Sequence, residues 1–105
     1  MENKAEQLES LKAKYGTVYT LTVPTNEEET EHATVSLKKV DRLIYNSVTK
    51  IIQKDEMLGT ESLIKSLWIG GDDVKLITDN FDALRSASIS LMPLIQAKEG
   101  SLKKN

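Results

Sequence analysis

Four consecutive residues, Gly70-Gly71-Asp72-Asp73, are the first candidate for chemistry in this chain of 105 residues. Paired aspartates beside glycines can hold magnesium for nucleotidyl transfer, but that chemistry also needs further carboxylates on a hairpin and a nucleotide-binding surface. The flanking segments have helical patterns, and the sequence contains no phosphate-binding glycine loop. We therefore predict that Asp72 and Asp73 cap a turn by accepting hydrogen bonds from backbone N–H groups, and that the chain uses no metal and no cofactor.

Three further groups could support catalysis or ion binding, and each has a simpler interpretation. His32 is the single histidine, and neither a nucleophile nor an orienting group accompanies it. The glutamates of residues 27–31 are typical of a solvated hairpin tip that discourages strand pairing. Ser86, Ser88 and Ser90 do not form a nucleophile elbow, and small residues at this spacing favour close helix packing. We therefore predict a protein without catalytic residues, which is not an enzyme.

The overall composition excludes several classes of protein. A net charge of −2, from 14 basic and 16 acidic residues, does not supply the positive field that general nucleic-acid binding needs. The chain has no cysteine, which excludes disulfides, thiolate metal sites and cysteine nucleophiles. The charged start is unlike a signal peptide, and no apolar run approaches the roughly 20 residues of a membrane span. We expect a cytoplasmic protein that contacts neither nucleic acid nor membrane.

Two runs of β-branched and aromatic residues, 17–23 and 32–38, surround the acidic segment and predict a β-hairpin. The residues expected to face inward alternate along the two strands: Tyr19, Leu21, Val23, Ala33, Val35 and Leu37. Two strands alone are marginal in water. The hairpin must therefore pack on the helices, on a second copy of the chain or on another protein.

Helices are predicted on both sides of the hairpin. Residues 2–14 have a thin apolar stripe on a highly charged segment, and Gly16 suits the end of that helix. A helix capped by Asp41 has the strongest apolar periodicity in the chain, which extends over residues 43–52.

The last part of the chain predicts two more helices. Gly59 interrupts the periodicity, Thr60 starts a short helix that includes Trp68, and Thr78 or Asp79 caps a last long helix. Pro93 is expected to kink or split that helix. The sequence thus predicts one small α+β domain over residues 1–105, in the order α-β-β-α-α-α. Residues 1–14 are expected to be loosely attached, and residues 101–105 form a tail.

Several short sequence segments, taken in this order, resemble segments of a family of small phage and prophage proteins, the tail assembly chaperones. The segments that carry the resemblance are the hairpin, Lys38-Lys39-Val40-Asp41-Arg42, the amphipathic helix 43–52, Leu63-Ile64-Lys65-Ser66-Leu67-Trp68 with Gly70-Gly71-Asp72, and the final segment 95–104. The resemblance implies a non-enzymatic protein that binds a long, helical tape-measure protein during tail assembly. Such chaperones keep the client soluble until tail tube subunits polymerise around it.

A helical client of this kind would lie in a groove between amphipathic helices. The residues expected to contact it are Leu63, Leu67, Trp68, Ile69 and Met92. Trp68 has a second interpretation, as a core anchor of the short helix. The open hairpin could instead pair between copies and give a homo-oligomer. Two alternative functions remain, a small structural or adaptor protein of a phage-like particle and an acidic regulatory partner of a basic protein.

Overall fold

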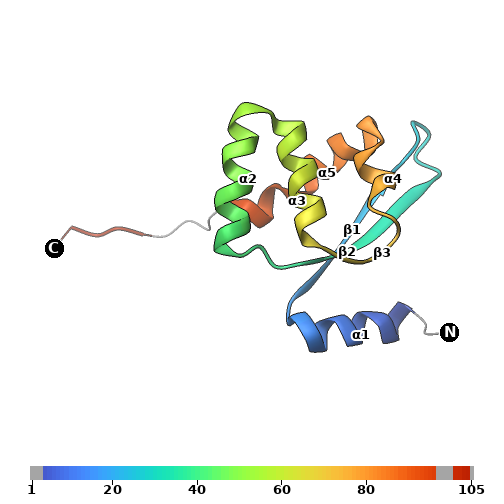
Figure 1. Cartoon of the computed structure of the whole chain (residues 1–105), viewed down its shortest axis with the longest axis horizontal. Coiled ribbons are helices and arrows are strands. Elements are labelled where there is room, and N and C mark those ends of the chain that lie inside the picture. Colours follow the sequence, from blue (N-terminus) through green and yellow to red (C-terminus); the bar gives the residue numbers. More distant parts are fainter. Residues whose placement is uncertain (1–3, 97–100, 105) are drawn as a thin grey trace.

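Five helices and three strands make up the computed structural model, which describes residues 4–96 and 101–104 (Figure 1). In chain order they are α1 (Lys4–Tyr15), β1 (Val18–Pro24), β2 (His32–Lys38), α2 (Arg42–Lys54), α3 (Glu56–Leu67), β3 (Trp68–Gly71), α4 (Lys75–Thr78) and α5 (Phe81–Ile95). The predicted α+β class is confirmed. The predicted helix start at residues 2–3, residues 97–100 of the final segment and residue 105 of the tail lie outside the described residues.

The β-hairpin forms as predicted. β1 and β2 pair antiparallel without a break, from Val18 opposite Lys38 to Pro24 opposite His32. The Asn26 side chain closes the loop, because its Oδ1 accepts hydrogen bonds from the N–H groups of Thr30 at 3.0 Å and Glu31 at 3.1 Å. The loop therefore has its own hydrogen bonds, and its glutamate side chains are exposed.

β3 is a strand that the sequence analysis assigned to a helix and its closing turn. It pairs antiparallel with β2, so the sheet has the order β1-β2-β3, with an irregularity between Ser36 and Leu37. Gly71 has a φ of 92°, and a Cβ there would lie 2.7 Å from the carbonyl oxygen of Thr34. Only glycine allows this approach. A strand of four residues with two glycines is too short to show alternation in the sequence.

α2 and α3 form a helical hairpin that meets at Gly59. Asp41 is the N-cap of α2, as predicted, and accepts a hydrogen bond from the Ile44 N–H at 2.8 Å. The predicted helix start at Thr60 is wrong, because α3 begins at Glu56 and contains Gly59. A Cβ on Gly59 would overlap the side chain and backbone of Ile52 in α2. The glycine that interrupts the apolar pattern therefore permits a close contact between α2 and α3.

Asn80, rather than Thr78 or Asp79, caps α5 and joins it to the hairpin. Its Oδ1 accepts a hydrogen bond from the Ala83 N–H at 3.2 Å, and its Nδ2 donates to the Thr25 carbonyl at 2.7 Å. α5 continues through Pro93 to Ile95, so the helix is not split there, and the predicted alternative of a kink stays a prediction. The short α4 before it was not predicted.

The core lies between the inner face of the sheet and the helices that follow it. α5 packs against β1, and α3 packs against β2 and α5. The fully buried larger side chains come from β1, β2 and three helices, α2, α3 and α4: Leu37, Leu63, Ile64, Leu67, Ile77, Val23, Val35 and Val48. Figure 1 shows α1 on the other side of the sheet from α2–α5, where Leu11 lies against Gly70. α1 is thus held through few contacts, mainly with β1.

Candidate protein-docking surface

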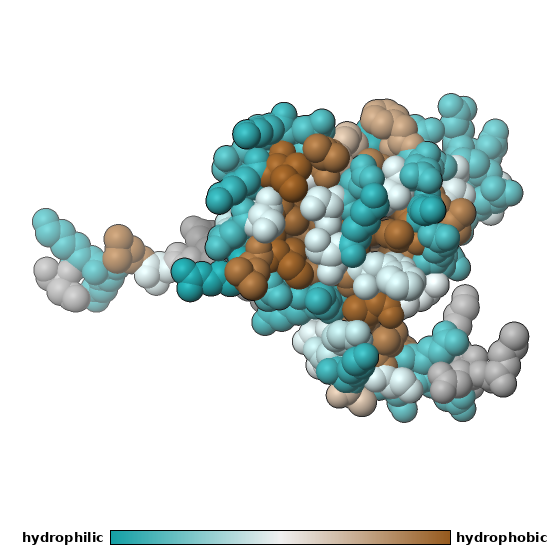
Figure 2. Space-filling model, viewed as in Figure 1, coloured by the Kyte–Doolittle hydropathy of each residue, from teal (hydrophilic) through white to brown (hydrophobic). Residues whose placement is uncertain are grey.

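Many large apolar side chains are exposed on this small domain. In residues 4–96 and 101–104 they are Tyr15, Tyr19, Leu43, Tyr45, Leu58, Trp68, Leu76, Phe81, Ile89 and Leu102. Figure 2 shows hydrophobic atoms gathered over α2 and α3, with polar atoms between them. Single exposed apolar residues are normal, whereas groups of them mark interaction sites. Two helical regions carry such groups, one around the start of α2 and one along α5.

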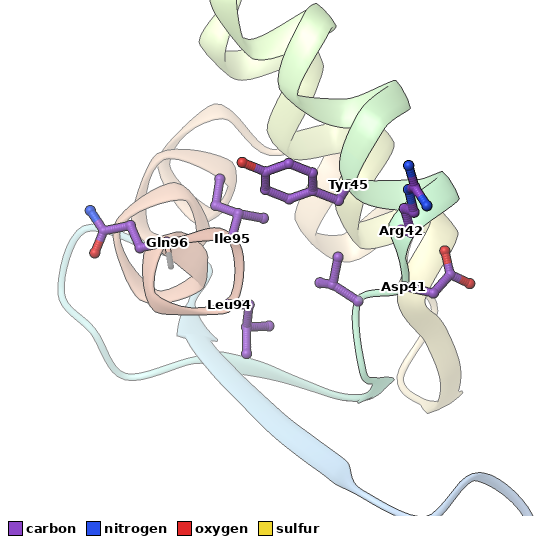
Figure 3. Close-up of a pocket in the computed structure, with 7 residues that line it drawn as sticks. Asp41, Arg42, Tyr45, Leu94, Ile95 and Gln96 are labelled. Atoms are coloured by element: carbon purple, nitrogen blue, oxygen red, sulfur yellow. The ribbon is translucent and has the colours of Figure 1, made fainter. Parts of the chain in front are cut away.

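An open slot separates the start of α2 from the end of α5 (Figure 3). It has a volume of about 290 Å³ and is lined by Val40, Asp41, Arg42, Tyr45, Leu94, Ile95 and Gln96. Figure 3 shows the Tyr45 ring extending from α2 toward Ile95, while Arg42 and Gln96 lie at opposite rims. Tyr45 is 45% exposed, and Leu94 and Ile95 are partly buried against the core. The slot therefore has an apolar floor and a polar rim.

The chemistry of this slot suits apolar contact rather than catalysis. The Asp41 carboxylate accepts the Ile44 N–H as the helix cap, and none of the described residues that line the slot beside it is a histidine, serine, threonine or cysteine. The volume is at the lower end of the roughly 300–1,000 Å³ typical of small-molecule sites. One or two apolar side chains of a partner suit this space.

A second, shallow groove lies between α2 and α3. Its volume is about 420 Å³, and its lining is Ile51, Leu58, Glu61, Ser62, Lys65 and Ser66. Lys65 donates a hydrogen bond to Glu61 at 2.7 Å along its rim. This hydrogen bond, with the negative charge of Glu61, raises the pKa of Lys65 above its ordinary value of 10.5. The pair is solvent-exposed and therefore stabilises the fold only weakly.

The structure divides the predicted client-contacting residues between the core and the surface. Leu63 and Leu67 are fully buried, because their side of α3 packs into the core. They are not on the surface, contrary to the expectation that they face a client. Trp68 is 40% exposed, and its Nε1–H donates to the Asp72 carbonyl at 3.0 Å. Ile69 and Met92 are partly buried, on β3 and α5 respectively. Partner contact by these last three residues stays a prediction.

The outer side of α5 was missed as a surface. Phe81 is 62% exposed, and Ile89 is 74% exposed. Arg85 lies between them at four-residue spacing, with its guanidinium 5.6 Å from the Phe81 ring centre. The sequence indicated this surface, because apolar residues occur on two sides of the helix. The core covers one side, so the apolar residues on the other side stay exposed.

The Asp72 and Asp73 carboxylates accept backbone N–H groups, as predicted, but Gly70 and Gly71 belong to β3 rather than to a turn. Asp72 Oδ2 accepts a hydrogen bond from the Thr34 N–H at 2.8 Å, and Asp73 Oδ1 accepts one from the Lys75 N–H at 2.9 Å. Within residues 4–96 and 101–104, no three histidine, cysteine or acidic side chains are grouped to hold a metal ion. In the same described part of the chain, no helix has the length and apolar character required to cross a bilayer.

Comparisons of this chain with models of protein families, with curated proteins and with solved structures found no match.

Proposed function

We propose that this chain is a non-enzymatic assembly adaptor, of the tail-assembly-chaperone kind, that binds an amphipathic helix of a larger protein. The observation that carries the proposal is the apolar slot between Tyr45 and Ile95, which is open to solvent on the described surface. Two helix ends form this slot, and helix-in-groove recognition places regularly spaced apolar anchors into such spaces.

The distribution of polar groups supports a protein ligand. Aromatic side chains such as Tyr45 are enriched at the centres of interfaces, and a polar rim like that of Arg42 and Gln96 commonly surrounds them. Leu58, which is 53% exposed, adds a second apolar position in the groove between α2 and α3. The resemblance to tail assembly chaperones agrees with this kind of partner, and it suggests a long, helical client.

A peptide-binding experiment tests the proposal. The probe is a labelled synthetic peptide with leucines on one face of a helix, and fluorescence anisotropy measures its affinity. Tyr45→Arg is expected to weaken binding by about tenfold, because it fills the slot with charge. Leu76→Arg is the matched control, since Leu76 in α4 is 51% exposed, receives the same charge and does not line the slot.

The peptide itself supplies a second control. A variant with a central proline keeps the leucines but cannot form the helix. The proposal requires strong preference for the helical peptide together with the loss at Tyr45→Arg. Equal affinity for both peptides, no binding of either, or an equal effect of the two protein variants would contradict it.

A further inference from the structure

The outer edge of β1 has backbone groups that β2 does not use. Thr25 donates its N–H to the Glu31 carbonyl at 2.8 Å, and these two residues are opposite in the hairpin register. Hydrogen-bonded and non-bonded pairs alternate along an antiparallel ladder. Val18, Thr20 and Thr22 therefore direct their N–H and C=O groups away from β2. Within residues 4–96 and 101–104, the sheet order places no strand on that side.

This edge has almost none of the features that normally prevent strands from pairing between molecules. β1 contains no charged residue over its seven positions, and its pairing with β2 has no bulge. Its one proline, Pro24, is the last residue. Natural edge strands usually carry lysine, an internal proline or a bulge. The opposite edge, β3, is short, irregular and glycine-rich. The two edges of this one sheet therefore differ in how well they are protected against strand pairing.

We propose that β1 pairs antiparallel with β1 of a second copy, so that two three-stranded sheets join across a two-fold axis. The register that we infer places Thr20 opposite Thr20 of the second copy and Val18 opposite Thr22. All three outward N–H groups of each strand are then used. A register centred on Leu21 would place the Pro24 ring where an N–H belongs, opposite Val18. The proline therefore selects the register centred on Thr20.

The charges at the two ends of the hairpin favour a second copy as the occupant. The hairpin tip, residues 27–31, carries four glutamates, whereas Lys12, Lys14, Lys38 and Lys39 lie near its base. Antiparallel pairing places the acidic tip of each copy beside the basic base of the other. The pairing thus brings opposite charges together at both ends, and no like charges face each other along the uncharged strands.

Exposed apolar side chains beside the edge support the same arrangement. Tyr19 is on the core side of β1 but is 38% exposed, and the inferred register places it opposite Leu21 of the second copy. α5 packs on β1, so a two-fold axis perpendicular to the sheet makes the two copies of α5 neighbours on one face. Stable interfaces bury about 800 Å² on each partner. Phe81 and Ile89 on α5 are available to supply area beyond the strand contact.

Sedimentation equilibrium across a dilution series, from millimolar to micromolar, tests the proposal. The full chain is expected to show a mass twice its 11.7 kDa, falling to one copy on dilution. Thr20→Pro removes the N–H donor at the centre of the outer edge of β1 and leaves the hydrogen bonds between β1 and β2 in place. It is therefore expected to weaken the dimer by about tenfold or more. Thr20→Val keeps the N–H group and the β-branched shape, and is expected to leave the dimer unchanged.

Further variants keep the test decisive if Thr20→Pro fails to fold, which circular dichroism would reveal. Thr22→Lys places a charge on the edge and is expected to dissociate the dimer. The chain has no cysteine, so Thr20→Cys can form only an intermolecular disulfide, and it is expected to cross-link faster than Thr22→Cys. A monomer at millimolar concentration, or a dimer that both edge variants leave intact, would overturn the proposal. Binding of the helical peptide is measured separately and does not decide this question.

Discussion

Trp68 donates its indole N–H to the backbone carbonyl of Asp72 at 3.0 Å, and this hydrogen bond joins the first residue of β3 to the residue that follows the strand. The same Asp72 receives the Thr34 N–H at its carboxylate and donates its own N–H to the Thr34 carbonyl at 2.9 Å. The tryptophan thus supports the contact that fastens the short third strand to the hairpin.

Trp68→Phe is expected to lower the free energy of unfolding by about 1 kcal/mol, because it removes this hydrogen bond while keeping an aromatic ring. Urea unfolding followed by circular dichroism measures the change. Tyr15→Phe, an exposed aromatic substitution on α1, should be close to neutral. Equal stability of the two variants would show that the indole bond contributes little.

Gly71→Ala is expected to destabilise the domain by about 2 kcal/mol or more. The left-handed φ of 92° is unfavourable for alanine, and the new Cβ would also press on the Thr34 carbonyl. Gly16→Ala separates the two effects, since Gly16 has a φ of 80° but open space around it. Thermal unfolding should show the larger loss at Gly71, and equal losses would mean that backbone conformation alone matters.

Gly59→Ala tests the contact between α2 and α3. Alanine favours a helix over glycine by about 1 kcal/mol, but the new methyl group would overlap Ile52. We expect a net loss of about 1–3 kcal/mol, typical of overpacking. Ser66→Ala, at an exposed position of the same helix, should gain stability slightly. A stabilised Gly59→Ala protein would show that the two helices separate easily.

Thr78→Val is expected to stabilise the domain by about 1 kcal/mol. Thr78 Oγ1 is buried, and no group in the described part of the chain accepts or donates a hydrogen bond to it. Thr60 is the matched control, because its buried hydroxyl donates to the Glu56 carbonyl at 2.9 Å. Thr60→Val should therefore not gain stability. Chemical unfolding of the two variants makes the comparison, and a gain that is no larger at Thr78 would contradict the prediction.

Local patterns predicted the elements whose signals lie within a few residues. Strand alternation located the hairpin, and Asp41 marked the start of α2 through the N-cap that it forms. Asp72 and Asp73 were recognised as turn residues for the same reason, since each carboxylate accepts a nearby or cross-strand N–H group.

The errors arose where distant parts of the chain decide the structure. Gly59 interrupts a pattern in sequence but permits a helix contact in space, and β3 exists only because β2 offers it an edge. The docking surface was the least predictable part. Leu63 and Phe81 are both apolar residues of predicted helices. Only the packing of α3 and α5 shows that Leu63 is buried and Phe81 is exposed.

The hydrogen bond from Asn80 to the Thr25 carbonyl joins groups that are 55 residues apart, and it has a consequence for synthesis. The hairpin is translated before α5, which packs on β1. Before α5 is present, the hairpin exposes an apolar face to solvent. Transiently exposed apolar surface of this kind makes a folding chain prone to aggregate. α5 therefore both covers the hairpin and forms one wall of the slot.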